Sequence, residues 1–117
     1  MKVTPLPKNM QCEEAIKCVF DLNKLDILVY KKLKGIGEAR ADELALVLDK
    51  ERSTVYRSLQ TLTDAGVCKK IRRTLKQGGY YHAYQCNDIS DIQKKAFDCL
   101  DSWYQSVKET LQLLSDK

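Results

Sequence analysis

Hydrophobic residues recur at helical spacing along most of this chain. Apolar positions three or four residues apart predict five helices, over residues 11–20, 23–34, 40–48, 51–65 and 89–114. Before the last helix the period shifts toward two. Two strands are predicted there, Val67–Thr74 and Tyr80–Cys86, with Gln77-Gly78-Gly79 as the turn of a hairpin. Residues 1–10 hold both prolines and few periodic apolar positions, so we expect a mobile N-terminal arm.

The second predicted helix has a recognisable beginning and end. Asn23 is a good N-cap residue, because its side chain can accept a hydrogen bond from a free backbone N–H. An apolar stripe follows at helical spacing, formed by Leu25, Leu28, Val29 and Leu33. We expect Gly35-Ile36-Gly37 to break the helix.

The third and fourth predicted helices form a close pair, because only Asp49-Lys50 separates them. Ala45 is small enough for the point where they cross, and Gly66 suits a left-handed C-cap after the fourth helix. The buried side of that helix is formed by Val55, Leu59 and Leu62. The expected fold is mainly α with a small β-hairpin wing. It combines a winged helix-turn-helix domain over residues 11–88 with a long C-terminal dimerisation helix over residues 89–117.

The positive charge is concentrated in one third of the chain. The 117 residues, enough for one domain, carry 20 Lys and Arg against 16 Asp and Glu, a formal net charge of +4. Residues 49–80 hold eight basic and three acidic side chains, so the net positive charge of this segment exceeds that of the whole chain. A basic block in a nearly balanced protein indicates a surface that meets a polyanion. The alternative is a solvated basic face that serves only solubility.

The outward face of the fourth helix carries side chains that suit phosphates and base edges in the major groove of double-stranded DNA. On and beside this helix the candidates are Arg40, Lys50, Arg52, Ser53, Thr54, Tyr56, Arg57 and Gln60. The hairpin adds Lys69, Lys70, Arg72, Arg73 and Lys76. The alternative is that the arginines form local surface pairs, that Tyr56 packs against the wing, and that the cations of the hairpin only keep the ribbon soluble.

Several of these segments resemble one family of regulators. They are Ala41-Asp42-Glu43-Leu44-Ala45, Arg52-Ser53-Thr54-Val55-Tyr56-Arg57-Ser58-Leu59, Leu62 and Ala65-Gly66-Val67. Over about residues 20–86 the chain resembles the winged-helix domain of TrmB-type regulators, frequent as short proteins in archaea, and is similar to the MarR and ArsR classes. The resemblance implies a recognition helix over residues 51–65 and a wing tip over residues 74–80. Full-length TrmB proteins carry a large C-terminal sugar-sensing domain, whereas one helix follows the hairpin here, so we do not expect sugar sensing.

The last predicted helix carries an apolar stripe longer than a small winged helix readily covers. The stripe is formed by Ile92, Ala96, Cys99, Leu100, Trp103, Val107, Leu111 and Leu114. Because exposed apolar stripes of this extent usually find a partner, we expect a homodimer. A two-fold dimer would present its recognition helices to half-sites about 34 Å apart, or a multiple of that. The alternative is that the helix folds back onto its own domain.

The cysteines suggest no scaffold of disulfides, because they are scattered, odd in number and without a Cys-x-x-Cys pair. They are Cys12, Cys18, Cys68, Cys86 and Cys99. We expect most of them to be small buried hydrophobes, and Cys68, beside the basic ribbon, to be the best candidate for a thiolate. With one histidine and no ArsR-type cysteine motif, we expect no metal and no cofactor. A small-molecule or redox effector stays open.

Together these features predict a sequence-specific DNA-binding transcriptional regulator that acts as a homodimer. The alternative is a winged-helix module that binds protein in the transcription machinery, without specific DNA binding. We do not expect an enzyme, because no nucleophile, base and orienting group are arranged together. No apolar run approaches the ~18 residues of a membrane span, and the start lacks a signal peptide, so we expect a cytoplasmic protein without a membrane partner.

Overall fold

The computed structural model describes residues 12–114, and the expected arm over residues 1–10 lies outside that range. The elements in chain order are α1 (Cys12–Phe20), α2 (Lys24–Ile36), β1 (Glu38–Ala39), α3 (Ala41–Leu48), α4 (Arg52–Asp64), β2 (Cys68–Thr74), β3 (Tyr80–Cys86) and α5 (Ile89–Leu114). The strands form one antiparallel sheet in the order β1-β3-β2. This arrangement confirms a winged helix-turn-helix fold with a long C-terminal helix.

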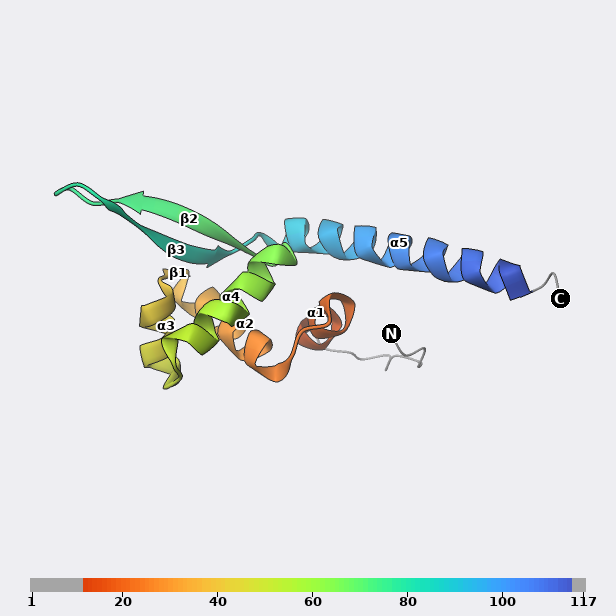
Figure 1. The fold of residues 1–117 in the computed structure, drawn as a ribbon, viewed down its shortest axis with the longest axis horizontal. Coiled ribbons are helices and arrows are strands. Elements are labelled where there is room, and N and C mark those ends of the chain that lie inside the picture. Colours follow the sequence, from red (N-terminus) through yellow and green to blue (C-terminus); the bar gives the residue numbers. More distant parts are fainter. Residues whose placement is uncertain (1–11, 115–117) are drawn as a thin grey trace.

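The molecule is elongated, because two of its elements leave the body in opposite directions (Figure 1). The β2–β3 hairpin projects to one side and α5 to the other, with α1 beneath the first part of α5. The principal extents are 68 × 28 × 26 Å. None of the helices within residues 12–114 is both long and apolar enough to cross a bilayer.

The structure corrects the sequence prediction around the end of α2. The helix does not break at Gly35 but continues to Ile36, since one glycine inside a helix costs only about 1 kcal/mol relative to alanine. Gly37 ends it with a φ of 103°, and its N–H donates to the Leu33 carbonyl at 2.7 Å. The next two residues form β1, which pairs with β3 and was not predicted because two residues are too few to show a strand period. Leu28, one of the four residues of the predicted apolar stripe, is exposed.

The turns on either side of α4 and at the tip of the hairpin agree with the prediction. Asp49 adopts a left-handed conformation with φ 56°, which closes the short turn between α3 and α4. Gly66 follows α4 with φ 84°. The Leu75 N–H donates to the Gly79 carbonyl at 3.0 Å and closes the hairpin.

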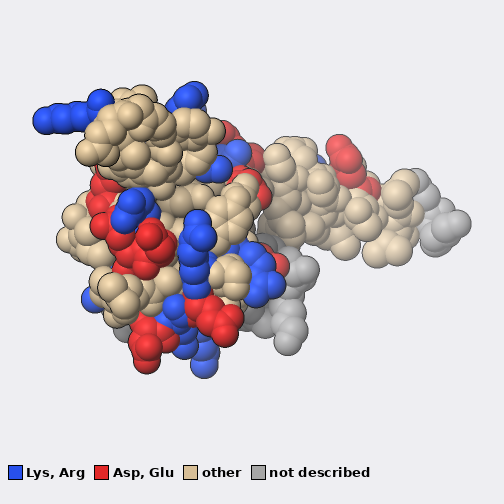
Figure 2. All heavy atoms as spheres, turned by 60° about the vertical axis from the view of Figure 1, so that its left-hand side comes forward, with Lys and Arg blue, Asp and Glu red and all other residues tan. Residues whose placement is uncertain are grey.

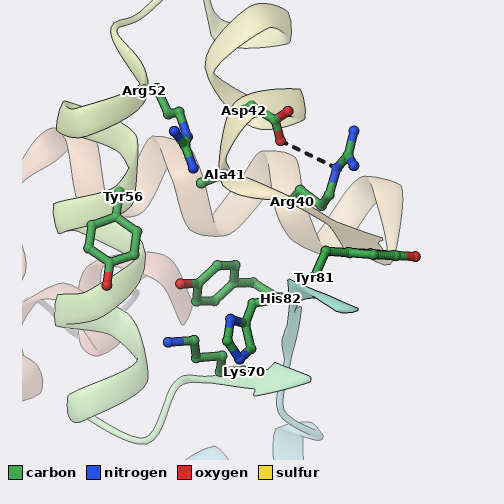
Figure 3. A pocket seen from close by; sticks show the side chains of 9 residues that line it. Arg40, Ala41, Asp42, Arg52, Tyr56, Lys70, Tyr81 and His82 are labelled. Carbon is green, nitrogen blue, oxygen red and sulfur yellow. Dashed lines mark ion pairs between the residues drawn. The ribbon is translucent and has the colours of Figure 1, made fainter. Parts of the chain in front are cut away.

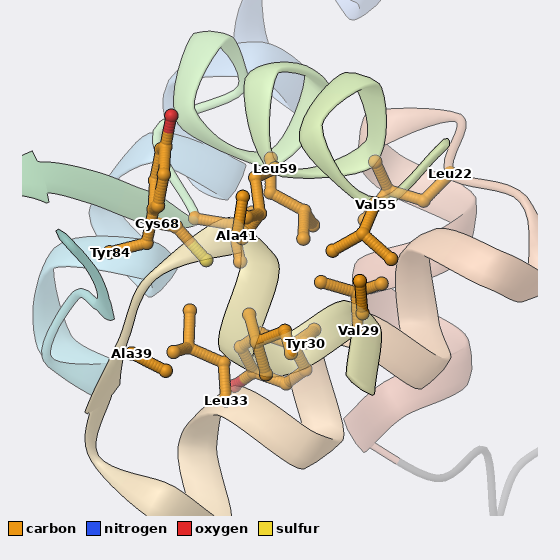
Figure 4. Packing of buried hydrophobic residues seen from close by; sticks show 14 of the residues in the cluster. Leu22, Val29, Tyr30, Leu33, Ala39, Ala41, Val55, Leu59, Cys68 and Tyr84 are labelled. Carbon is orange, nitrogen blue, oxygen red and sulfur yellow. The ribbon is translucent and has the colours of Figure 1, made fainter. Parts of the chain in front are cut away.

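The core forms where α4 packs against α2, α3 and the base of the sheet (Figure 4). As predicted, Val55, Leu59 and Leu62 are fully buried. The other elements contribute Val29, Tyr30, Leu33, Ala41, Leu44, Ala45, Val67, Cys68 and Tyr84, among others. Burying one large aliphatic side chain contributes about 1.5–3 kcal/mol, so these three residues hold α4 firmly with its other side in solvent.

A buried polar contact fixes α4 relative to α2. Asp26 and Ser58 are each only 4% exposed, and the Ser58 hydroxyl donates to Asp26 Oδ1 at 2.5 Å. The other oxygen of the carboxylate, Oδ2, accepts the Asn23 N–H at 3.1 Å. Asn23 Oδ1 in turn accepts the Asp26 N–H at 2.7 Å, which completes a capping box. One carboxylate therefore caps α2 and anchors the middle of α4.

We predict that Ser58→Ala lowers the free energy of unfolding by about 1–3 kcal/mol, because it leaves a buried carboxylate oxygen without its donor. Urea denaturation followed by circular dichroism measures the change. Ser53→Ala, on the exposed face of the same helix, is the matched control and should change stability by no more than about 0.5 kcal/mol. Equal stabilities for the two variants would contradict the anchoring role of Ser58.

Candidate nucleic-acid interface

The side of α4 opposite the core is polar and exposed. Ser53, Arg57 and Gln60 are spaced four and three residues apart and lie on this outward side. Gln60 Nε2 donates to Asp64 Oδ1 at 3.4 Å, one turn further along. Within residues 12–114 the Arg57 guanidinium has no ion-pair partner. Its five N–H donors therefore remain available to a ligand.

The first turn of α4 faces the sheet. Arg52 and Tyr56 are one turn apart on the flank between the outward and buried sides, and both line a hollow beside the sheet (Figure 3). Thr54 is partly buried, so it is the least accessible of the predicted contacts on this helix. No side chain caps the N-terminus of α4, whose N-cap position is occupied by Glu51. The first N–H groups of the helix are thus left for an external acceptor.

A hollow of about 330 Å³ separates this flank of α4 from the sheet. Its lining residues are Arg40, Ala41, Asp42, Arg52, Tyr56, Lys70, Tyr81, His82 and Tyr84. In Figure 3 the Arg52 guanidinium and the Lys70 ammonium approach the hollow from different elements, with His82 beside Lys70. Neither cation has an ion-pair partner in the part of the chain that the structure describes. The hollow therefore carries positive charge together with phenol and imidazole hydrogen-bonding groups.

The register of the hairpin divides the predicted wing cations between two faces. Lys70 lies opposite Tyr84, and Arg72 opposite His82. Because side chains alternate along a strand, these pairs share one face with each other, and Lys69 and Arg73 lie on the reverse face. The Arg72 guanidinium stacks over the Tyr80 ring at 4.0 Å from its centroid. The face that carries Lys70 and Arg72 is the one that turns toward α4.

Two of the predicted DNA contacts are paired with acids. Arg73 Nε donates to Glu38 Oε2 at 2.9 Å. This hydrogen bond lowers the pKa of the Glu38 carboxyl and raises that of Arg73. Arg40 Nε lies 3.4 Å from Asp42 and 3.5 Å from Glu43, and its guanidinium lies over the Tyr81 ring. Both arginines therefore bring less free charge to the surface than the sequence suggested.

The surface around the hollow is not uniformly basic. Figure 2 shows lysine and arginine side chains interspersed with acidic ones over the body, whereas the visible part of α5 is largely uncharged. Lys50 and Lys76 are exposed, the first in the turn before α4 and the second in the tip of the hairpin. The free cations are therefore spread over the α3–α4 turn, the start of α4 and the hairpin, on a surface that also carries acidic side chains.

Sequence reasoning missed the residues of β3 in this site. Tyr81, His82 and Tyr84 line the hollow, although only the cations of the neighbouring strand were predicted. Burial raises the pKa of the Tyr84 hydroxyl, and the nearby Tyr56 adds to this effect. The aromatic run from residue 80 to residue 84 was the available signal, but it indicated only a strand.

The predicted dimer stripe is exposed over most of α5 but not at its beginning. Ile92 is 2% exposed and packs in the core of its own chain, so its assignment to a dimer interface is corrected. Ala96, Cys99, Trp103 and Val107 are partly exposed. Leu100, Leu111 and Leu114 are exposed, and the helix also exposes Phe97, Tyr104 and Leu113. Among the described residues of the stripe, Ile92 is the one buried in its own domain, and the expectation that the stripe extends beyond that domain applies to residues after 92.

The cysteine prediction changes as well. Cys68 is 2% exposed, and its hydrogen bond to Cys86 and its burial raise its pKa, so the thiol predicted to be the best thiolate candidate is one that deprotonates with difficulty. Cys86 has a lowered pKa, because the Cys68 thiol donates to it and Lys34 lies nearby. Among residues 12–114, no three His, Cys, Asp or Glu side chains lie close enough to hold a metal ion.

Comparisons with known proteins agree with this architecture. Residues 16–90 match the model of the family described as sugar-specific transcriptional regulator TrmB. The uncharacterized protein MJ1082 of Methanocaldococcus jannaschii is 30% identical over 104 residues, covering 89% of this chain and 86% of its own.

Two solved structures show the same fold. A possible transcriptional regulator from Methanosarcina mazei is 26% identical, with a TM-score of 0.71 and 88% of each chain covered. TrmBL2, an archaeal chromatin protein, is 22% identical with a TM-score of 0.60, over 89% of this chain and 36% of its own. On the match over residues 16–90, which spans more than half of the sequence, this chain belongs to the TrmB family of transcriptional regulators.

Proposed function

We propose that this protein is a cytoplasmic, homodimeric transcriptional regulator that binds double-stranded DNA at specific sequences. The observation that carries the proposal is the convergence of unpaired cations from α4 and the hairpin on one hollow beside the uncapped start of α4. TrmBL2, which shares the fold, is described as binding DNA, and this supports the same class of partner.

The hollow suits a phosphate group of the DNA backbone. Arg52 offers planar paired N–H donors from α4, and Lys70 offers a point charge from β2 on the other wall of the hollow. Phosphate contacts of this kind fix the register of a protein on DNA without reading its sequence. Arg52 and Lys70 would therefore set where α4 enters the major groove.

Sequence reading falls to the outward side of α4. Arg57 can donate two hydrogen bonds to the O6 and N7 atoms of a guanine, and Gln60 can pair with an adenine. Ser53, one turn before Arg57, can donate or accept. These side chains lie on the side of α4 opposite its buried residues. This outward side would face the floor of the major groove once the phosphate contact is made.

A second copy of the chain is the proposed partner of α5. The helix has 26 residues, about 39 Å in length, and its apolar side chains beyond Ile92 are partly or largely exposed. Trp103, Tyr104, Val107 and Leu111 line a shallow apolar groove that a matching helix would fill. Since α5 projects away from the hairpin, pairing through it would leave both recognition helices free (Figure 1).

We expect Lys70→Ala to weaken DNA binding several-fold and to reduce the slope of log affinity against log salt by about 1, because one phosphate contact is lost. Fluorescence anisotropy with a labelled duplex at several salt concentrations measures both. Lys69→Ala is the matched control, since it removes the same charge from the reverse face of the same strand. If the two substitutions weaken DNA binding equally, the affinity depends only on the net charge of the protein. That result would exclude a phosphate contact of Lys70 in the hollow.

Replacing Arg57 with alanine should cost about 1–3 kcal/mol of binding to a cognate site and much less to unrelated DNA, because a base contact is removed. Cognate sites come from selecting bound fragments of genomic DNA with the purified protein. Lys94→Ala, an exposed cation on α5, controls for charge. If Arg57→Ala weakens both kinds of DNA equally, Arg57 contacts the backbone instead. A wild-type protein whose DNA binding is absent or insensitive to salt would favour the protein-interaction module.

We predict that Leu111→Glu converts the dimer into a monomer, because it places a charge in the apolar groove of α5. Sedimentation equilibrium should then give 13.4 kDa in place of twice that mass. Leu46→Glu is the matched control, as Leu46 is 84% exposed on α3 and should leave the dimer intact. A wild-type protein that sediments as a monomer at micromolar concentration would refute the proposed assembly.

A further inference from the structure

Two cysteines face each other across the base of the hairpin. Cys68 is directly opposite Cys86 in the β2–β3 register, and their sulfur atoms are 4.0 Å apart. At the neighbouring pair of residues on the side away from the hairpin tip, the Asn87 N–H donates to the Val67 carbonyl at 2.9 Å. In an antiparallel ladder, hydrogen-bonded and non-hydrogen-bonded pairs alternate, so the cysteine pair occupies a non-hydrogen-bonded position.

This position brings the two backbones to the separation that a disulfide needs. Directly opposite Cα atoms at non-hydrogen-bonded positions are about 4.5 Å apart, within the roughly 4.4–6.8 Å range of disulfides. The sulfur atoms already point toward each other, since the Cys68 thiol donates to Cys86 Sγ. A disulfide then requires the two sulfurs to close from 4.0 Å to about 2.05 Å, which rotation of the side chains can supply between backbones at this separation.

The two thiols have different environments. Cys68 is buried, whereas Cys86 is partly exposed and its thiol donates to the Tyr30 carbonyl oxygen of α2 at 3.7 Å. The hydrogen bond from Cys68 and the charge of Lys34 lower the pKa of Cys86, while the pKa of Cys68 is raised. Cys86, the sulfur that a small oxidant can reach, is therefore the more readily deprotonated of the two thiols.

We propose that Cys68 and Cys86 form a reversible intramolecular disulfide when the protein meets a hydroperoxide. In the first step the Cys86 thiolate attacks one peroxide oxygen. The O–O bond breaks, hydroxide or alkoxide leaves, and Cys86 becomes a sulfenic acid. In the second step the Cys68 sulfur attacks Cys86 Sγ, the S–O bond breaks, and the proton of Cys68 leaves with the hydroxyl group as water. Two thiols are oxidised and one peroxide is reduced, and a dithiol reverses the bond by exchange.

The disulfide would join the two strands two residues before Lys70 and two residues after Tyr84. Both of those residues line the hollow beside α4. The inference does not rest on DNA binding, because it concerns the chemistry of the thiol pair alone.

Mass spectrometry of the full chain tests the proposal directly. Each of the five cysteines falls on a separate tryptic peptide, and Cys68 and Cys86 lie on residues 58–69 and 77–94. The reduced protein is treated with hydrogen peroxide, quenched with catalase, alkylated with N-ethylmaleimide under denaturing conditions and digested. We expect to find the two peptides joined by a disulfide and to see them separate after dithiothreitol. On a non-reducing gel the oxidised protein should run as a single chain.

Variants separate the two steps. Cys68→Ser should lose the cross-link and leave a sulfenic acid on Cys86 that dimedone traps, whereas Cys86→Ser should lose both products. Cys99→Ser, on α5, is the control and should retain the cross-link. Complete alkylation of Cys68 and Cys86 in the peroxide-treated wild type would overturn the proposal, and so would disulfides formed only between chains. The wild-type experiment decides this even if a variant fails to fold.

Discussion

The orientation of α4, the proposed recognition helix, depends on one buried carboxylate. The Asp26 carboxylate accepts hydrogen bonds from the Ser58 hydroxyl of α4 and from the Asn23 N–H at the start of α2. The same group therefore caps α2 and holds α4 against it. Apolar packing of Val55, Leu59 and Leu62 decides which side of α4 is buried, but such packing tolerates some sliding and rolling. A hydrogen bond between two specified atoms does not tolerate such movement, because breaking it would leave a buried oxygen unpaired at a cost in free energy. The outward residues of α4 therefore face a direction that is set in α2.

Features that depend on local periodicity were predictable from the sequence. The stripes of α3 and α4, the turn at Asp49 and the hairpin at Gly78-Gly79 each have a local cause in residue type and spacing. The Asp26–Ser58 contact had no such signal, because an acidic residue in the first turn of a helix ordinarily faces solvent. The pairing of Arg73 with Glu38 joins residues 35 positions apart through the addition of β1, a strand too short to show in the pattern. Strand register, which sets Cys68 against Cys86, likewise required the structure.

The candidate site shows why a list of cations is a weak description of a DNA-binding surface. Lys69 and Lys70 are adjacent in sequence, yet the pleat of β2 places them on opposite faces of the ribbon. Arg40 and Arg73 are occupied by nearby acids, whereas Arg52, Arg57 and Lys70 are not paired with any described residue. The face on which each side chain lies, and whether an acidic residue pairs with it, reduce the thirteen candidate residues to a few that can act together. They also add tyrosines and a histidine that the charge pattern did not indicate.

The uncovered apolar side of α5 has a consequence for how such a regulator would respond to its own abundance. Where paired chains dissociate at cellular concentrations, the amount of assembled protein rises with the square of the total, so occupancy of a two-fold operator would change more steeply than the protein level. Residues such as Leu111 and Leu114, remote from any nucleotide, would then set the threshold at which a gene responds.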